Sequence, residues 1–210
     1  MADFFKDISR ELLVIQYGNA EGDDLDLLVV SPKAPYHQQV RLGALDVTIL
    51  PVRLAVHLAA HKDILISTPL SQGSLVHSDG STFDLLLREL QSSRPRHSIV
   101  SHHLSQSTQC RQNAEQLLRL AEQELSAASA EIYCHSLAWY LSYFVAAKMY
   151  VNEKEEVLTF DDLLASPYGT ELTKIRCNAK VYGKGERAIT VKALKALFER
   201  VDRMLIDASG

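Results

Sequence analysis

Three aspartates in the first fifty residues offer the clearest chemistry in this sequence. Asp24 and Asp26 open an apolar run that continues to Val30, and Asp46 stands near the start of a second run, Leu45–Leu50. Both runs are too short for a helix and are typical of strands. Side chains two apart in a strand share a face, so Asp24 and Asp26 share a small space. Such carboxylates repel each other unless a proton or a cation lies between them, and oxygen ligands favour Mg²⁺ over zinc.

The order of these residues resembles the signature of the polymerase β-type nucleotidyltransferase superfamily. That signature is a Gly-Ser turn, then Asp-x-Asp opening a hydrophobic strand, then one Asp on a neighbouring strand. The matching positions here are Gly18-Asn19, Asp24 with Asp26, and Asp46. The resemblance covers roughly the first ninety residues. Two departures are visible: Asn19 replaces the family's serine, and the segment from the glycine to the first aspartate is several residues shorter than in the family.

The resemblance implies a metal-dependent enzyme that transfers a nucleoside monophosphate from an NTP or dNTP to a hydroxyl group and releases pyrophosphate. Two Mg²⁺ ions, with Mn²⁺ as an alternative, would be bound by Asp24, Asp26 and Asp46. Asp46 would also help to deprotonate the attacking hydroxyl. Gly18 would let the backbone approach the triphosphate, and Asn19 would donate a hydrogen bond to it.

Length and composition predict a folded chain of one large domain or two small ones, because 47% of its 210 residues are hydrophobic. The polar, proline-bearing segment 91–96 is the best linker candidate. Strand-like runs prevail before it, and long helical periodicity follows it. We therefore predict an α+β fold, with a nucleotidyltransferase core of small mixed sheet at 1–95 and an all-α helical bundle at 96–210. The bundle would bind the acceptor or a protein partner.

Helical spacing of apolar residues predicts a helix over 52–63, directly after the second aspartate-bearing strand. A turn and a short strand are predicted over 68–77, because Pro69 and Gly73 interrupt that stretch. His57 and His61 lie four residues apart on the predicted helix, a spacing that can bind metal. No third ligand is placed near them in the sequence, so an ordinary helix surface is the simpler interpretation.

The charge is unevenly distributed along the chain. Residues 1–50 contain eight acidic and four basic side chains, whereas residues 171–200 contain eight basic and three acidic ones. Within the basic run, Arg176, Lys180 and Lys184 are the candidates for binding nucleotide or strand phosphates. This run favours a nucleic-acid or oligonucleotide acceptor. Solvated helix faces would explain the basic residues equally well.

Two other functions remain open at this point. Acidic side chains of the helical half, among them Glu153, Asp161 and Asp162, would suit a cationic acceptor such as an aminoglycoside-like antibiotic. Small nucleotidyltransferases of the kanamycin type, and the minimal ones paired with helical partners, show a similar arrangement, and a protein hydroxyl is a further acceptor in the superfamily. The short glycine-to-aspartate segment instead favours a non-catalytic nucleotide-binding regulatory subunit or a toxin–antitoxin subunit.

Cysteine usage and hydropathy predict a cytoplasmic protein without membrane insertion. Cys110, Cys134 and Cys177 are odd in number and far apart, which favours neither a disulfide framework nor a zinc site. The N-terminal residues lack the basic region and long apolar core of a signal peptide. The longest apolar stretch, residues 137–149, is interrupted by Ser142 and Lys148.

Overall fold

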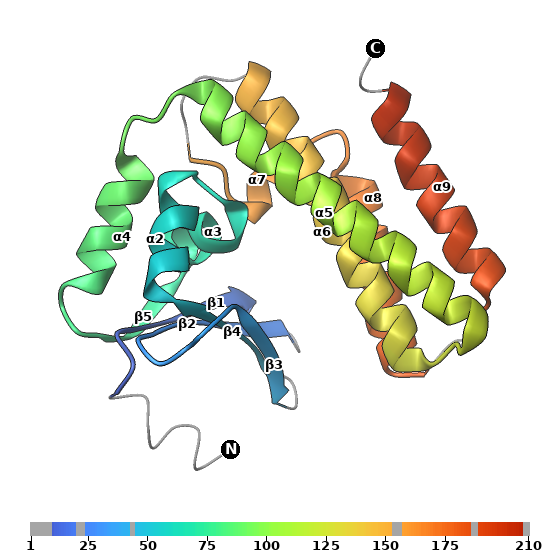
Figure 1. The fold of residues 1–210 in the computed structure, drawn as a ribbon, viewed down its shortest axis with the longest axis horizontal. Coiled ribbons are helices and arrows are strands. Elements are labelled where there is room, and N and C mark those ends of the chain that lie inside the picture. The colour runs from blue at the N-terminus through green and yellow to red at the C-terminus, as the bar shows by residue number, and fades with distance from the viewer. Residues whose placement is uncertain (1–9, 20–23, 43–44, 153–156, 186–188, 208–210) are drawn as a thin grey trace. The chain divides into compact units, whose positions relative to one another are not determined.

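The computed structural model describes residues 10–19, 24–42, 45–152, 157–185 and 189–207 (Figure 1). The chain is an α+β protein, as predicted, and it divides into two compact units. The first unit comprises residues 1–98 together with 156–159, and the second comprises residues 99–155 and 160–210. The predicted boundary after residue 95 lies close to the first division, whereas the return of segment 156–159 to the first unit was not predicted.

The first unit is built on a five-stranded mixed sheet with the strand order β3-β4-β2-β1-β5. Its strands are β1 (Leu13–Asn19), β2 (Asp24–Ser31), β3 (Gln38–Leu42), β4 (Leu45–Pro51) and β5 (Ser74–Ser78). The central pair β2 and β4 is parallel, and the other neighbouring pairs are antiparallel. Strands β2 and β4, which carry the three aspartates near their first residues, therefore start at the same end of the sheet.

Three helices complete the first unit: α2 (Val52–Ala60), α3 (Ile64–Gln72) and α4 (Thr82–Gln91). Figure 1 shows α2 and α3 over one face of the sheet. Buried side chains from β1, β2 and β4 pack there against residues of all three helices, including Ile15, Leu28, Leu50, Leu58, Ile66 and Leu86. A second apolar cluster occupies the opposite face, with Val14, Leu27, Val29, Leu45 and Val47. Both faces of the central strands are therefore buried, which explains their nearly continuous apolar sequence.

The prediction of a turn at Thr68 and Pro69 was wrong, because both residues lie within α3. The Asp63 carboxylate begins this helix by accepting a hydrogen bond from the Leu65 backbone N–H at 2.9 Å. Pro69 is itself buried in the helix. Burial of the apolar side of α3 therefore outweighs the helix-breaking tendency of proline, which a local sequence pattern cannot show.

The second unit is helical. It contains nearly all of α5 (Arg96–Gln123), together with α6 (Ala127–Asn152), α7 (Phe160–Ala165), α8 (Gly169–Gly183) and α9 (Val191–Asp207). Helix α6 is buried along most of its length, in keeping with its largely apolar sequence. Side-chain hydrogen bonds join it to its neighbours: Ser107 donates to the Tyr140 carbonyl at 3.1 Å, and Tyr133 donates to the Leu194 carbonyl at 2.9 Å.

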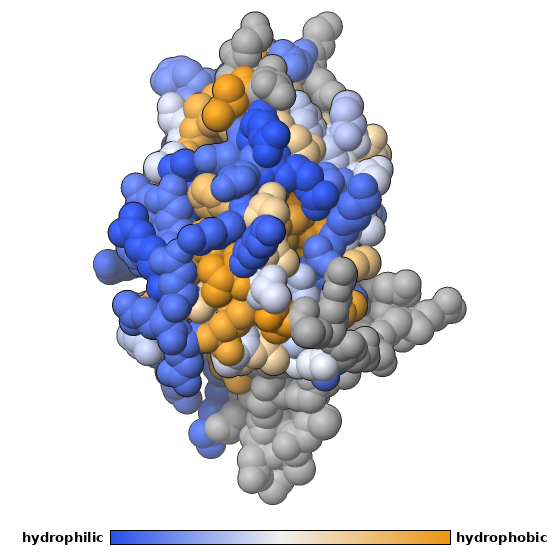
Figure 2. All heavy atoms as spheres, turned by 90° about the vertical axis from the view of Figure 1, so that its right-hand side faces the viewer, coloured by the Kyte–Doolittle hydropathy of each residue, from blue (hydrophilic) through white to orange (hydrophobic). Residues whose placement is uncertain are grey.

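On the face drawn in Figure 2, hydrophilic residues cover much of the surface, and hydrophobic residues form smaller areas between them. None of the helices in the described part of the chain combines the length and the apolar character that a membrane crossing requires.

Candidate metal site

The parallel register of β2 and β4 brings two of the predicted aspartates together. Asp26 lies directly opposite Asp46, and the pairing continues from Leu25 with Leu45 to Ser31 with Pro51. Neighbouring strands are about 4.8 Å apart, and residues opposite each other in a sheet share a face. Asp26 and Asp46 are both half-buried. The register thus places two carboxylates of like charge next to each other on one face of the sheet.

The third aspartate, Asp24, is the first residue of β2 and lies two residues before Asp26. Positions two apart along a strand share a face and are separated by about 6.6 Å. Antiparallel pairing with β1 places Asn19 opposite Asp24 and Tyr17 opposite Asp26. Polar positions from three adjacent strands therefore meet where β2 and β4 begin.

This polar group lies on the same sheet face as the core shared with the helices. Leu28 and Val30 follow Asp26 at every second position of β2, so they share its face, and both belong to that core. Tyr17 packs against the same core and is only partly buried. The apolar core therefore ends where β2 and β4 begin, and the aspartates lie next to it. Packing of this core fixes the strands that carry them.

The strand β1 includes Gly18 and Asn19, the two positions that match the family's turn. Gly18 pairs with Leu25, and its φ angle is 86°, a left-handed conformation that favours glycine. Strand pairing therefore takes the place of the expected turn. Only residues 20–23 separate β1 from β2, which is too short for a phosphate-binding helix of ordinary length. The backbone conformation alone accounts for the glycine, and its role in nucleotide binding stays a prediction.

One further residue, Arg41, lies opposite Asp46 in the antiparallel register of β3 and β4. Sequence reasoning did not select Arg41, because its place beside Asp46 depends on the hairpin between β3 and β4. The alternation in Gln39-Val40-Arg41 was a usable signal: Val40 pairs with buried Val47, so its neighbours fall on the opposite face. A row of register partners thus runs across four strands, from Arg41 through Asp46 and Asp26 to Tyr17.

Such a row can bind a divalent cation. Oxygen ligands on adjacent strands fit Mg²⁺, which takes one or two carboxylates and keeps several waters. A cation would also relieve the repulsion between Asp26 and Asp46. Helix α2 carries two further side chains of a type that can ligate a metal, His57 and His61, whose ring centroids are 4.3 Å apart. There, Nδ1 of His61 lies 2.8 Å from the His57 carbonyl oxygen, a local helix-end hydrogen bond.

The predicted phosphate-binding residues Arg176, Lys180 and Lys184 belong to the second unit. Arg176 and Lys180 are on α8, and Lys184 is its C-cap residue. The Arg176 guanidinium lies over the Phe160 ring, 4.6 Å from its centroid, so this side chain has a packing role between α7 and α8. Lys180 and Lys184 are exposed. Their participation in nucleotide binding stays a prediction.

Comparison with known proteins adds no relative. No protein-family model matches the chain, and no curated protein matches it. The resemblance to nucleotidyltransferases therefore depends on the aspartates and their order alone.

Proposed function

We propose that the chain is a metal-dependent nucleotidyltransferase, which transfers a nucleoside monophosphate from an NTP or dNTP to a hydroxyl acceptor. The register of Asp26 with Asp46 on adjacent parallel strands carries this proposal. Asp24, two residues before Asp26 on the same strand, adds a third carboxylate. Three carboxylates on rigid strands, rather than on loops, suit a site that must hold its geometry during phosphoryl chemistry.

The three aspartates have different roles in this proposal. Asp24 and Asp26 bind the cations, and Asp46 binds the cation on the acceptor side and accepts the proton of the attacking hydroxyl. When bound, two Mg²⁺ ions would stabilise the charge on the phosphate oxygens and on the departing pyrophosphate.

The acceptor in this proposal is the end of a nucleic acid or oligonucleotide. Its support is the charge of α8 and the segment after it, where Lys180 and Lys184 are exposed. An aminoglycoside-like small molecule and a protein hydroxyl are the other acceptor classes to test.

A second candidate function is metal and nucleotide binding without turnover, as in a regulatory or toxin–antitoxin subunit. The position of Gly18 and Asn19 within β1 favours it, because the family's turn before the Asp-x-Asp strand is replaced here by strand pairing. Such a protein would keep the three aspartates and their affinity for Mg²⁺, but would not position the triphosphate for attack.

A transfer assay tests the proposal. The full chain is incubated with each α-labelled NTP and dNTP, with Mg²⁺ or Mn²⁺, alone and with single-stranded RNA, DNA, a protein mixture or an aminoglycoside. Label on an acceptor is expected for the wild type. We expect Asp26→Asn to reduce this transfer by about a hundredfold or more. Asp84→Asn is the matched control, because Asp84 is an exposed aspartate on α4 in the same unit.

The outcomes separate the two functions. Mg²⁺ binding that is lost in Asp26→Asn, without label transfer to any acceptor, would favour the non-catalytic subunit. Equal transfer by wild type and Asp26→Asn would exclude the site formed by Asp24, Asp26 and Asp46 as the catalytic site.

A further inference from the structure

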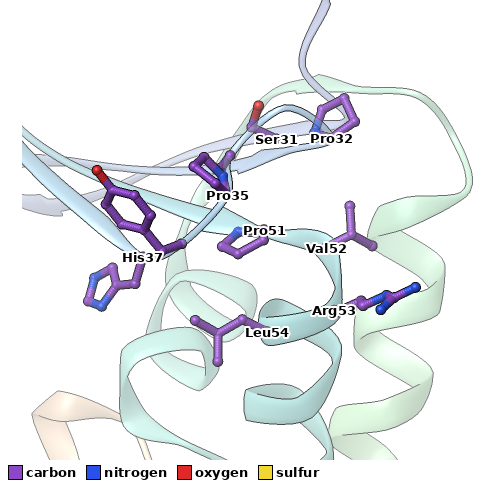
Figure 3. Close-up of a pocket in the computed structure, with 10 residues that line it drawn as sticks. Ser31, Pro32, Pro35, His37, Pro51, Val52, Arg53 and Leu54 are labelled. Atoms are coloured by element: carbon purple, nitrogen blue, oxygen red, sulfur yellow. The ribbon is translucent and has the colours of Figure 1, made fainter.

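A pocket in the first unit lies away from the aspartates, between the loop after β2 and the first turn of α2 (Figure 3). Its volume is about 630 Å³, within the range of small-molecule sites. Ser31 and Pro51, at its base, are register partners and the last residues of β2 and β4. We call this site, lined by residues 31, 32, 34–37 and 51–54, the β2–α2 pocket. Ligands of α/β sheets bind outside the carboxyl ends of parallel strands, and the pocket has this location.

The walls of the pocket are apolar and stiff. Pro32 and Pro35 come from the loop, and Pro51 joins β4 to α2. Figure 3 shows Pro35 on the loop above Pro51. A proline ring fixes φ, so these walls lose little conformational freedom when a ligand binds. The Lys33 N–H also donates to the Ser31 hydroxyl at 3.3 Å, which holds the start of the loop.

The charge at the pocket is positive. Arg53 belongs to the lining and is exposed, and it makes no ion pair with any residue that the structure describes. Pro51, the N-cap of α2, has no side chain that could accept the first backbone N–H groups, and the described first turn contains no acidic residue. An uncapped helix start favours negative charge. None of the described lining residues is acidic.

A third polar group, His37, stands at the other end of the pocket from Arg53 (Figure 3). Its ring comes from the loop before β3, and its pKa is lowered by partial burial, against the opposing charge of Asp63. At neutral pH the ring is therefore neutral and can donate or accept one hydrogen bond. The pocket thus combines apolar walls, a cationic end and a neutral polar end.

We propose that the β2–α2 pocket binds a small organic anion, with a flat apolar ring between Pro35 and Pro51 and a carboxylate or phosphate group at Arg53 and the α2 start. Ser31 lies five positions after Asp26 on β2, a distance of about 17 Å along an extended strand. The pocket is therefore a second site, and the proposal does not depend on nucleotidyl transfer. Carboxylate and phosphate share the chemistry that Arg53 recognises, and the experiment distinguishes them.

Binding is tested by titrating the full ¹⁵N-labelled chain with phenyl phosphate, benzoate and uncharged benzyl alcohol, at constant pH and ionic strength. We expect saturable shifts of the backbone amides of Arg53 and Leu54 with at least one of the two anions. The anion that shifts them at the lower concentration identifies the preferred head group. Benzyl alcohol should require at least tenfold more ligand, because it lacks the charge. Inorganic phosphate, which lacks the ring, should also bind at least tenfold more weakly.

Two variants separate the pocket from non-specific anion binding. Arg53→Gln should weaken binding of the preferred anion at least tenfold, while Arg88→Gln, at an exposed arginine of α4, should leave it unchanged. Unchanged affinity in Arg53→Gln, or equal shifts with benzyl alcohol, would overturn the proposal. Shifts confined to amides outside residues 31–37 and 51–54 would overturn it as well. Retained wild-type amide dispersion in Arg53→Gln shows that the variant is folded.

Discussion

Asp26 in the first unit and Asp202 in the second differ in the residues that the fold places beside them. In the first unit, the register partner of Asp26 is Asp46, a residue of like charge. In the second, Asp202 of α9 receives hydrogen bonds from Arg111 Nε at 3.1 Å and Nη2 at 2.8 Å, and from the Tyr140 hydroxyl at 2.7 Å. The charge of Asp202 is therefore compensated by the fold itself.

The contacts of Asp202 identify it as a structural carboxylate. Arg111 also contacts Glu115 at 2.7 Å and lies over the Phe198 ring, so Asp202 is part of a network that joins α5, α6 and α9. The hydrogen bonds from Arg111 lower the pKa of Asp202, and burial raises the pKa of Tyr140. A network of this kind stabilises the helical unit. Two like charges in register do not by themselves stabilise a sheet, which is the arrangement that the proposed metal site uses.

The largest expected effect is that Mg²⁺ stabilises the first unit and leaves the second unit unchanged. At a hundredfold excess over its dissociation constant, Mg²⁺ should stabilise the first unit by about 2.7 kcal/mol. Amide hydrogen exchange of the full chain should show slower exchange in β2 and β4, and no change in α9. Asp26→Asn should abolish the effect, and Asp84→Asn should retain it. Equal protection of both units by Mg²⁺ would contradict a specific site.

Loss of Asp202 should destabilise the second unit by about 2 kcal/mol. Asp202→Ala removes two charge-assisted hydrogen bonds and one from a tyrosine, and the partial exposure of the pair limits the cost. Trp139, the single tryptophan, lies on α6 and reports urea unfolding of this unit by fluorescence. Glu199→Ala, at an exposed position of α9, is the control. A loss of less than about 0.5 kcal/mol would show that the network is dispensable.

Replacement of Asp26 should raise the stability of its unit, whereas replacement of Asp202 should lower it. In EDTA, Asp26→Asn should stabilise the first unit by about 1 kcal/mol, because it removes the repulsion between charges about 5 Å apart at a hydrated surface. Hydrogen exchange in β2 and β4 should therefore become slower than in the wild type. Faster exchange would show that Asp26 is a structural residue, as Asp202 is.

The fold was predictable where local pattern and tertiary structure agree. The strands with Asp26 and Asp46, and the helices α5 and α6, follow from short apolar runs and from long helical periodicity. The register between Asp26 and Asp46 could not be derived, because it depends on a strand pairing across twenty residues of sequence. Pairing with Leu25 likewise keeps Gly18 in β1, where the glycine alone indicated a turn. The β2–α2 pocket was missed because the prolines of 31–37 indicated only a loop.

Acid should weaken the second unit through Asp202. Its pKa in the folded protein lies below the unfolded value of about 3.9, so its contribution to stability is complete above that pH. The contribution is lost as the pH falls through the folded pKa. The urea midpoint followed by Trp139 fluorescence should therefore decline below about pH 4, and this decline should be shallower in Asp202→Asn. Parallel declines in the two proteins would show that other carboxylates cause the acid sensitivity.

The smallest expected effect is on RNA binding by Lys180 and Lys184, the exposed basic residues at the end of α8. If Lys180 and Lys184 bind strand phosphates, replacing both with alanine should weaken binding of a short single-stranded RNA by several-fold. It should also flatten the dependence of log affinity on log salt by about 1.4, since each contact to a single strand contributes about 0.7. Arg176 is kept in this variant, because its guanidinium packs on Phe160.

The control for this variant must carry the same change of charge. Arg119 and Arg203 are exposed basic residues of the same unit outside the basic run, so their double replacement with alanine removes two charges elsewhere. A slope that flattens only in the Lys180 and Lys184 variant would localise the phosphate contacts to α8. Equal slopes in all three proteins would identify these lysines as ordinary solvated residues and leave a small-molecule hydroxyl as the preferred acceptor. Because Asp24, Asp26 and Asp46 are unchanged in each variant, that result would not bear on the proposed metal site.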